Sequence, residues 1–191
     1  LGADADDQSG RSVSSAGDVN GDGFDDLIIG AFRADGTGNA KDRSGESYVI
    51  YGGQNLSNVD LATLTPAQGF TISGADANDY SGLSVSSAGD VNGDDFDDLI
   101  IGAPRAYGTD ITQNASGESY VIYGGQNLSN VGLDTLTTDQ GFTILGADLI
   151  DLSGTSVSSA GDINGDGFDD LIIGAYFADG TDNAKGSSGE S

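Results

Sequence analysis

The sequence contains no histidine, cysteine, methionine or tryptophan, and only 2 of its 191 residues are proline. Without histidine and cysteine the chain cannot build a histidine-based catalytic triad, a disulfide, a thiolate zinc site or an iron–sulfur cluster. Basic residues are also scarce: the chain has 6 Lys and Arg and 31 Asp and Glu, which gives a formal net charge of −25. This balance argues against partners such as nucleic acid or an anionic membrane surface, since both require a basic footprint.

Long apolar runs are absent as well. None approaches the ~18 residues of a transmembrane helix, so we expect no membrane insertion. The N-terminal stretch, LGADADDQSG, has neither a basic nor an apolar signal region. We therefore expect any targeting segment to have been removed or to lie outside this sequence. Glycine is abundant instead, with 32 residues, and the apolar residues, 36% of the chain, gather in short runs.

A run of 20 residues, SVSSAGDVNGDGFDDLIIGA in its first copy, recurs at an interval of 72 residues. The three copies occupy 12–31, 84–103 and 156–175. The first two full repeats align without gaps and match at 55 of 72 positions. No linker rich in proline or charge separates the copies, so we expect them to pack directly on one another as one repeat domain. The predicted units are two full repeats, 1–72 and 73–144, and a partial third, 145–191.

Each repeat has the pattern of short strands separated by Gly, Asn, Asp and Ser turns. In the first repeat the expected strands are 12–17, 27–31, 48–51 and 69–72, and the segment 61–68 is compatible with one helical turn. The apolar strands LIIGA and YVIY do not alternate with polar residues, which indicates burial on both faces. A β-sandwich would show alternation, and a parallel β-helix would have a shorter period. The predicted fold is all-β, with β-propeller blades of four antiparallel strands, one per 72-residue repeat, in a partial propeller or open array.

The most informative motif is a nine-residue acidic loop after the first strand of every repeat. Side-chain oxygens stand at loop positions 1, 3, 5 and 9, and a backbone carbonyl at position 7 can complete the cage. Calcium takes ~6–8 hard oxygen ligands in flexible geometry, so we predict one Ca²⁺ per repeat and three per chain. The predicted ligands are Asp18, Asn20, Asp22, the Phe24 carbonyl and Asp26; Asp90, Asn92, Asp94, the Phe96 carbonyl and Asp98; and Asp162, Asn164, Asp166, the Phe168 carbonyl and Asp170.

Other readings of these loops fit less well. A solvated Asp/Gly turn explains one copy better than it explains three in the same strand–loop–strand context. An EF-hand needs a bidentate Glu at position 12, where these loops have isoleucine, and flanking helices. Magnesium tends to keep its waters, and zinc would need nitrogen or sulfur ligands. The second loop carries Asp95 where the others have glycine at position 6, so we expect strain or a differently tuned site there.

The repeated run and the residues that follow it are similar to those of a known family of repeats. The repeated run, followed by SGESYVIYGG at 44–53, resembles the FG-GAP repeats of integrin α-subunit propellers and their bacterial relatives. The literal Gly-Ala-Pro occurs at 102–104, whereas QSG, YSG and LSG stand where Phe-Gly is usual. The resemblance covers the whole chain. It implies a propeller, usually of about 7 blades, with calcium between the first and second strands of a blade, and extracellular adhesion or scaffolding more often than catalysis.

Three further sets of polar residues recur and are open to a functional interpretation. They are the pairs Asp4/Asp7, Asp76/Asp79 and Asp148/Asp151, the strand-entry residues Glu46, Glu118 and Glu190, and the N-x-S residues Asn55, Asn114 and Asn127. For the Asp pairs we favour turn hydrogen bonds over a second ligand site. For the Glu residues we favour bonds to local backbone or to arginine over catalysis. Glycan attachment at the Asn residues stays open.

No acidic residue stands in a unique setting, and an active site generally breaks repeat symmetry. We therefore predict a non-catalytic, calcium-stabilised structural or adhesive repeat protein, extracellular or at the cell surface, such as a filament or surface-layer building block. One alternative is an adhesion module that binds a protein or glycan ligand through inter-blade loops, which the variable stretches 38–43 and 110–115 favour. A glycoside hydrolase-associated domain is a more remote alternative. Ten strands cannot close a ring of ~4–8 four-stranded blades, so the expected partners are further repeats of a longer parent chain or other copies of this chain.

Overall fold

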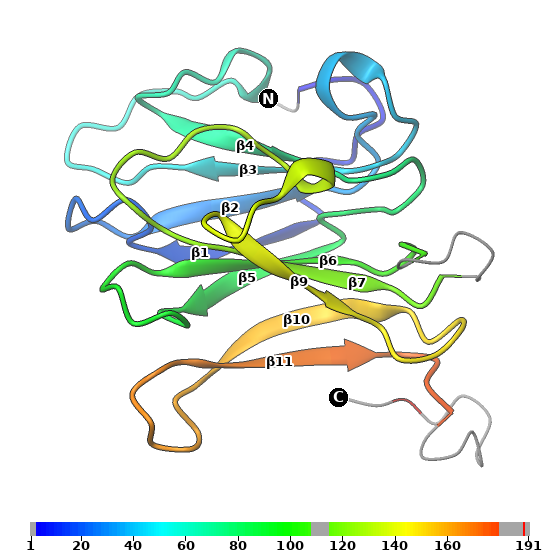
Figure 1. Cartoon of the computed structure of the whole chain (residues 1–191). Coiled ribbons are helices and arrows are strands. Elements are labelled where there is room, and N and C mark those ends of the chain that lie inside the picture. Colours follow the sequence, from blue (N-terminus) through cyan, green and yellow to red (C-terminus); the bar gives the residue numbers. More distant parts are fainter. Residues whose placement is uncertain (1–2, 108–114, 180–188, 190–191) are drawn as a thin grey trace.

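The computed structural model of the chain describes residues 3–107, 115–179 and 189. Three antiparallel sheets stack side by side, one for each repeat (Figure 1). The first blade comprises β1 (Ser12–Gly17), β2 (Asp26–Ala31), β3 (Glu46–Ile50) and β4 (Gly69–Ser73). The second comprises β5 (Ser84–Gly89), β6 (Asp98–Ala103), β7 (Glu118–Ile122) and β9 (Gly141–Leu145), and the third has β10 (Ser153–Gly161) and β11 (Asp170–Ala175).

Strands of one blade pair in chain order, as the repeat pattern predicts. In the first blade, Leu27 of β2 lies opposite Ile50 of β3, and Tyr48 of β3 lies opposite Thr71 of β4. The predictions of an all-β fold and of four-stranded antiparallel blades are confirmed, and the ten expected strands are all present in the described part of the chain. The described part of the chain also has three short 3₁₀ turns: η1 (Thr37–Asn39), η2 (Leu61–Thr63), where a helical turn was expected, and η3 (Leu133–Thr135).

One strand was not expected. β8 (Val131–Gly132) belongs to the connection between β7 and β9, yet it pairs in parallel with β4 of the first blade, Ile72 opposite Val131. The side chain of Asn130 adds a bond by accepting from the Thr71 N–H at 3.0 Å. The second repeat therefore reaches across the first and adds a fifth strand to its sheet.

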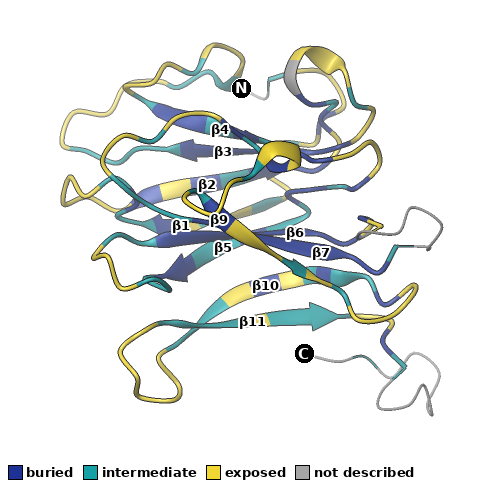
Figure 2. Ribbon diagram, viewed as in Figure 1, coloured by how far each residue is buried: buried dark blue, intermediate teal, exposed yellow. Residues whose placement is uncertain are grey.

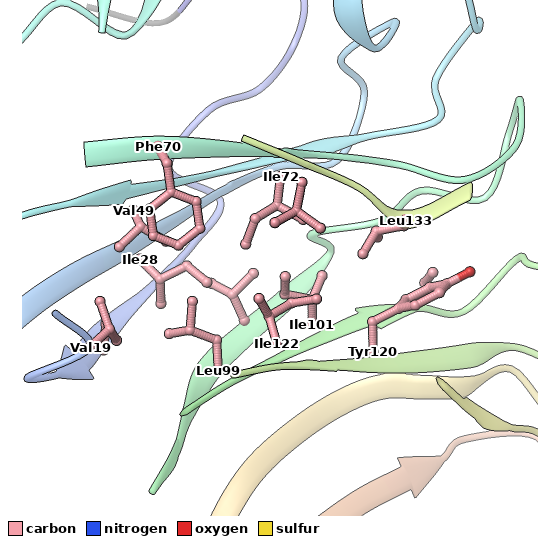
Figure 3. Packing of buried hydrophobic residues seen from close by; sticks show 14 of the residues in the cluster. Val19, Ile28, Val49, Phe70, Ile72, Leu99, Ile101, Tyr120, Ile122 and Leu133 are labelled. Atoms are coloured by element: carbon pink, nitrogen blue, oxygen red, sulfur yellow. The ribbon is translucent and has the colours of Figure 1, made fainter. Parts of the chain in front are cut away.

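The core lies between the blades. Ile28, Val49 and Phe70 of the first blade pack against a face of the second that includes Leu99 and Ile101 (Figure 3). The opposite face of the second blade packs on the third, through residues such as Ile100 and Val157. All six residues of β6 are buried. Burial on both faces explains why LIIGA lacks an alternating pattern.

The outer faces of the two end blades are only partly covered (Figure 2). On the first blade, Tyr48 is buried with Leu61 and Leu64 packed near it, whereas other residues of that face are exposed. Val13 of β1 is 63% exposed, whereas its equivalents Val85 and Val157 are 5% and 6% exposed. At the opposite end of the stack, Ile172 of β11 is 47% exposed, while Ile28 and Ile100 are fully buried. The described chain is therefore an open array of blades. Its described residues include no helix long or apolar enough to cross a membrane.

Candidate metal-binding loops

The three acidic loops lie in the β1–β2, β5–β6 and β10–β11 hairpins, at the same end of each blade (Figure 1). Each strand pair has a register shift just before its loop, as between Ser15 and Gly17 in the first blade. The loop then curls back on its first residue. The repeat thus presents the same acidic turn three times along one side of the stack.

The aspartate at position 1 organises the turn. One carboxylate oxygen of Asp18 accepts from the N–H groups of Gly21 and Asp22 at 2.8 and 3.0 Å, and the other accepts from Gly23 at 2.8 Å. Asp90 and Asp162 accept the same three bonds in the second and third loops. The predicted ligands at the start of all three loops therefore share one local geometry.

The side chains at positions 3 and 5 point along the same turn. Asn20 accepts from the Asp22 N–H at 2.8 Å and donates its amide N–H to the Asp22 carboxylate at 3.1 Å. Asp22 in turn accepts from the Phe24 N–H at 3.0 Å. In the third loop the Asn164 amide donates to Asp170 at 3.3 Å instead. Phe24 and Phe168 are exposed at position 7.

The aspartate at position 9 is the most buried predicted ligand. The carboxylate of Asp26 accepts from the N–H of Val19 at 3.1 Å and of Gly52 at 2.7 Å. Asp98 accepts equivalent bonds from Val91 and Gly124. The aspartate at position 9 thus bonds both to the start of its own loop and to the segment that follows the third strand of the blade.

Charge is disfavoured at these buried positions. Burial raises the pKa of Asp26 to about 6, against the two N–H bonds that lower it, and the nearby carboxylates of Asp22 and Asp18 raise it further. Burial raises the pKa of Asp98 to about 6 in the same way. In the open third loop, backbone N–H bonds led by that of Gly167 lower the pKa of Asp162. A divalent cation would relieve the repulsion that acts at the two buried positions.

The donor set fits calcium, although it is spread along the loop. Every predicted ligand is a hard oxygen, and a carboxylate oxygen that accepts one N–H keeps a lone pair for a cation. Among the described residues no three acidic side chains stand close enough together to hold a metal ion as they are. Coordination would therefore require the side chains at positions 3, 5 and 9 to turn toward the carboxylate at position 1.

The second loop keeps its shape despite Asp95. This residue adopts φ of 70°, in the left-handed region that Gly23 and Gly167 occupy at the same position. Its N–H donates to Asp90 at 3.0 Å, as that of Gly23 donates to Asp18. The substitution adds strain and one negative charge without rearranging the turn.

Sequence reasoning missed the residues that connect one loop to the next. Asp97, at position 8 of the second loop, accepts from the Asp18 N–H at 2.8 Å, and its own N–H donates to the Asp18 carbonyl at 3.3 Å. Asp169 makes the same pair of bonds with Asp90. The sequence held a signal for this role, because each loop has two consecutive Asp residues and only the second, at position 9, is a predicted ligand. The first, at position 8, had no assigned role.

The recurring polar residues outside the loops have structural partners. Asp7, Asp79 and Asp151 accept from the N–H groups of Asp4, Asp76 and Asp148 at 3.0, 2.9 and 3.2 Å, which confirms the turn interpretation. Glu46 and Glu118 accept from the hydroxyls of Tyr48 and Tyr120, so their partner is tyrosine and not the expected backbone or arginine. Asn55 and Asn127 are exposed, while Asn114, Glu190 and most of the stretch 110–115 lie outside the described residues.

Stacked four-stranded blades with an acidic turn in each first hairpin define a propeller-type repeat protein. The family model of the FG-GAP repeat matches residues 9–50, 81–122 and 153–189, which is more than half of the chain. The chain therefore belongs to the FG-GAP repeat family, and the resemblance seen in the sequence is confirmed.

The relatives of this chain include phosphatidylinositol-glycan-specific phospholipase D and integrin alpha chains. Phosphatidylinositol-glycan-specific phospholipase D of Bos taurus is 32% identical over 180 residues, covering 93% of this chain and 20% of the relative. Integrin alpha-5 of Xenopus laevis is 31% identical over 176 residues, covering 90% and 15%. Integrin alpha ina-1 of Caenorhabditis elegans is 30% identical over 169 residues, covering 83% and 14%. The chain thus spans a fifth or less of the length of these relatives.

Proposed function

We propose that this chain is a calcium-stabilised, non-catalytic FG-GAP module with an adhesive or structural role outside the cell. The observation that carries the proposal is the acidic turn, which has the same all-oxygen donors and the same hydrogen bonds around position 1 in all three copies. Such threefold repetition suits a structural ion better than an active site, which needs one unlike position.

Calcium would act on the contacts between blades as well as on each loop. The ligands at positions 1, 3, 5, 7 and 9 would hold it, and its charge would offset the clustered carboxylates. Asp18 and Asp90 also bond the next loop through Asp97 and Asp169. Ordering one loop would therefore stiffen its contact with the neighbouring blade.

The extracellular and adhesive parts of the proposal have separate support. Calcium modules with ~0.1–1 mM affinity suit the calcium concentration outside cells. Several relatives are integrin alpha chains by name, which favours a module that binds a protein ligand. The exposed apolar faces at both ends of the stack favour the second candidate, a building block of a filament or surface layer.

A calcium titration tests the central claim. We expect calorimetry to detect three calcium equivalents per chain, and the melting temperature to rise, since ~2.7 kcal/mol of stability follows from a hundredfold excess over Kd. Asp22→Asn keeps an acceptor for the Phe24 N–H but loses the carboxylate charge and the oxygen that accepts from Asn20, so the first site should be lost and two equivalents should remain. Asp25→Asn changes the same charge at loop position 8 and should leave three. A melting temperature that a chelator does not change, with no calcium uptake, would refute the proposal.

A further inference from the structure

A cavity of about 400 Å³ spans all three blades, lined by residues next to the starts of β1, β5 and β10 and the ends of β2, β6 and β11. The acidic turns follow the other ends of these first strands, so the cavity and the turns lie at opposite ends of the blades. The charged and aromatic lining residues are Arg11, Arg33, Arg105, Phe32, Tyr80 and Tyr176. Its size is within the ~300–1,000 Å³ of small-molecule sites.

Half of the basic residues of the chain line this one cavity, since Arg11, Arg33 and Arg105 are three of the 6 Lys and Arg. No Asp or Glu is among the lining residues. The ion pairs found among the described residues involve Lys41 and Arg43, so none of the three arginines is paired with a carboxylate there. In a chain with a net charge of −25, three arginines therefore gather where no described carboxylate competes for their N–H donors, which suits an anion.

Aromatic rings hold the guanidinium groups in place. Arg11 and Arg33 lie 5.7 and 5.5 Å from the centre of the Phe32 ring, and Arg105 lies 4.7 Å from the centre of the Tyr80 ring. The two rings themselves pack edge to face at 5.6 Å. Stacking of this kind restricts the long arginine side chains, so less conformational entropy is lost when they bind a ligand.

The repeat symmetry breaks at this cavity. When the residues of the second and third repeats are renumbered by subtracting 72 and 144, all lining residues fall at positions 8, 11, 32 and 33 of the repeat. The residue type at positions 8, 11 and 32 differs among all three copies. Arg11, for example, is replaced by Leu83 in the second copy and by Thr155 in the third, although the Ser-Gly before it and the serine after it are the same in each. In the sequence we looked for a break in the repeat symmetry among the acidic residues and found none there. The break lies among basic and aromatic residues, as a site for one ligand requires.

We propose that this cavity binds the carboxylate of an acidic sugar residue. A guanidinium group matches a carboxylate with two parallel N–H bonds. Tyr176 is 66% exposed, and its ring offers an apolar surface to a sugar ring, while Gln8 and Thr155 offer partners to the hydroxyls of the sugar. A ligand with one charge is favoured over a polyanion, because the charge of the whole chain repels a polyanion beyond the cavity. The inference deepens the proposed adhesive role and rests on it, but not on calcium.

The test compares two ligands that differ only in the carboxylate, methyl glucuronide and methyl glucoside, by calorimetry on the calcium-saturated chain. We expect the glucuronide to bind at least about tenfold more tightly, since a charge-assisted bond is worth ~1.5–3 kcal/mol and ~1.4 kcal/mol is tenfold. Arg11→Leu and Arg33→Phe introduce the residue types that the other copies carry at these positions, Leu83 and Phe177. Each should weaken glucuronide binding about tenfold.

Thr138→Asp is the matched control, because it makes the same change in net charge at an exposed turn that does not line the cavity. It should leave glucuronide affinity unchanged. Absence of glucuronide binding, equal binding of the glucoside, or unaltered affinity in both arginine variants would overturn the proposal. Preferential binding of N-acetyl-aspartate amide would also overturn it and assign the cavity to an acidic peptide. Calcium-dependent melting of the same samples shows separately whether the proposed function stands.

Discussion

Asp79 shows what burial does to a single carboxylate in this chain. The residue is 2% exposed and its Oδ2 accepts from the Asp76 N–H at 2.9 Å, while its buried Oδ1 has no hydrogen-bond partner among the residues that the structure describes. Burial raises the pKa of Asp79 to about 7, against the effect of the Asp76 N–H, and the charges of Asp76 and Glu118 raise it further. The folded state therefore prefers the protonated form of this side chain.

The pH dependence of stability follows from that preference. Because the folded-state pKa of about 7 lies above the ordinary value of 3.8, the contribution of Asp79 is greatest below pH 4, falls as pH rises toward 7 and is constant above that. Asp79→Asn keeps an acceptor for the Asp76 N–H and does not titrate. Relative to this variant, the wild type should lose on the order of a few kcal/mol between pH 4 and pH 7.

Urea denaturation across this range, at saturating calcium, measures the difference. Asp139→Asn, at an exposed position, is the control and should follow the wild type closely at every pH. A free-energy gap between the wild type and Asp79→Asn that stays constant from pH 4 to pH 7 would contradict the assignment.

At the scale of elements, neighbouring acidic loops interlock. The Phe96 ring lies so close to Gly21 that a Cβ there would overlap it, and Phe168 stands in the same relation to Gly93. Both glycines also have positive φ, of 73° and 78°. The carboxylates of Asp97 and Asp169 add the bonds to the preceding loop. The contact between blades is thus built partly from the loops proposed to hold calcium.

Asp97→Ala should weaken this contact. It removes the acceptor of the part-buried Asp18 N–H and should cost about 1 kcal/mol of unfolding free energy. Asp25→Ala is the matched control, because Asp25 holds the same loop position in the first blade, where it is exposed. Its effect should stay within about 0.5 kcal/mol. Equal effects of the two substitutions, measured by chemical denaturation in calcium, would show that the cross-blade bond contributes nothing.

The strands and the acidic turns could be predicted from the sequence because each depends on a local pattern that the chain repeats. Strand β8 could not, since Val131 becomes a strand residue only where the edge of β4 lies beside it. Val59 holds the same repeat position in the first copy and is not in a strand. The roles of Asp97 and of Arg11 were missed for the same reason. The sequence repeat shows which residues recur in each copy, but it does not show which residues of different blades come into contact. Asp97 and Arg11 act through such contacts.

For the whole molecule, equivalent residues of the three blades differ in burial. Leu27 is 54% exposed in the first blade, whereas Leu99 is 1% exposed in the second. The face with Val13 and Leu27 corresponds to the face of the second blade that packs on the first, and the face with Ile172 corresponds to the one that packs on the third. The two ends of the stack are therefore complementary to each other. A second copy, or a further repeat, could reproduce an internal contact at either end.

We expect this 191-residue chain to associate head to tail in calcium, as the apolar ends predict. Such contacts give rings if the rotation closes and filaments if it does not. The net charge of −25 opposes association, so higher salt should promote it. Leu27→Asp should suppress it, because a carboxylate would then have to be buried between blades. Leu56→Asp makes the same change at a 70% exposed loop position and should leave association intact. Sedimentation velocity over a range of concentrations measures both variants. A cooperatively folding wild type that stays monomeric at high concentration would show that the outer blades need no further cover on their outer faces, and the filament alternative would then lose its support.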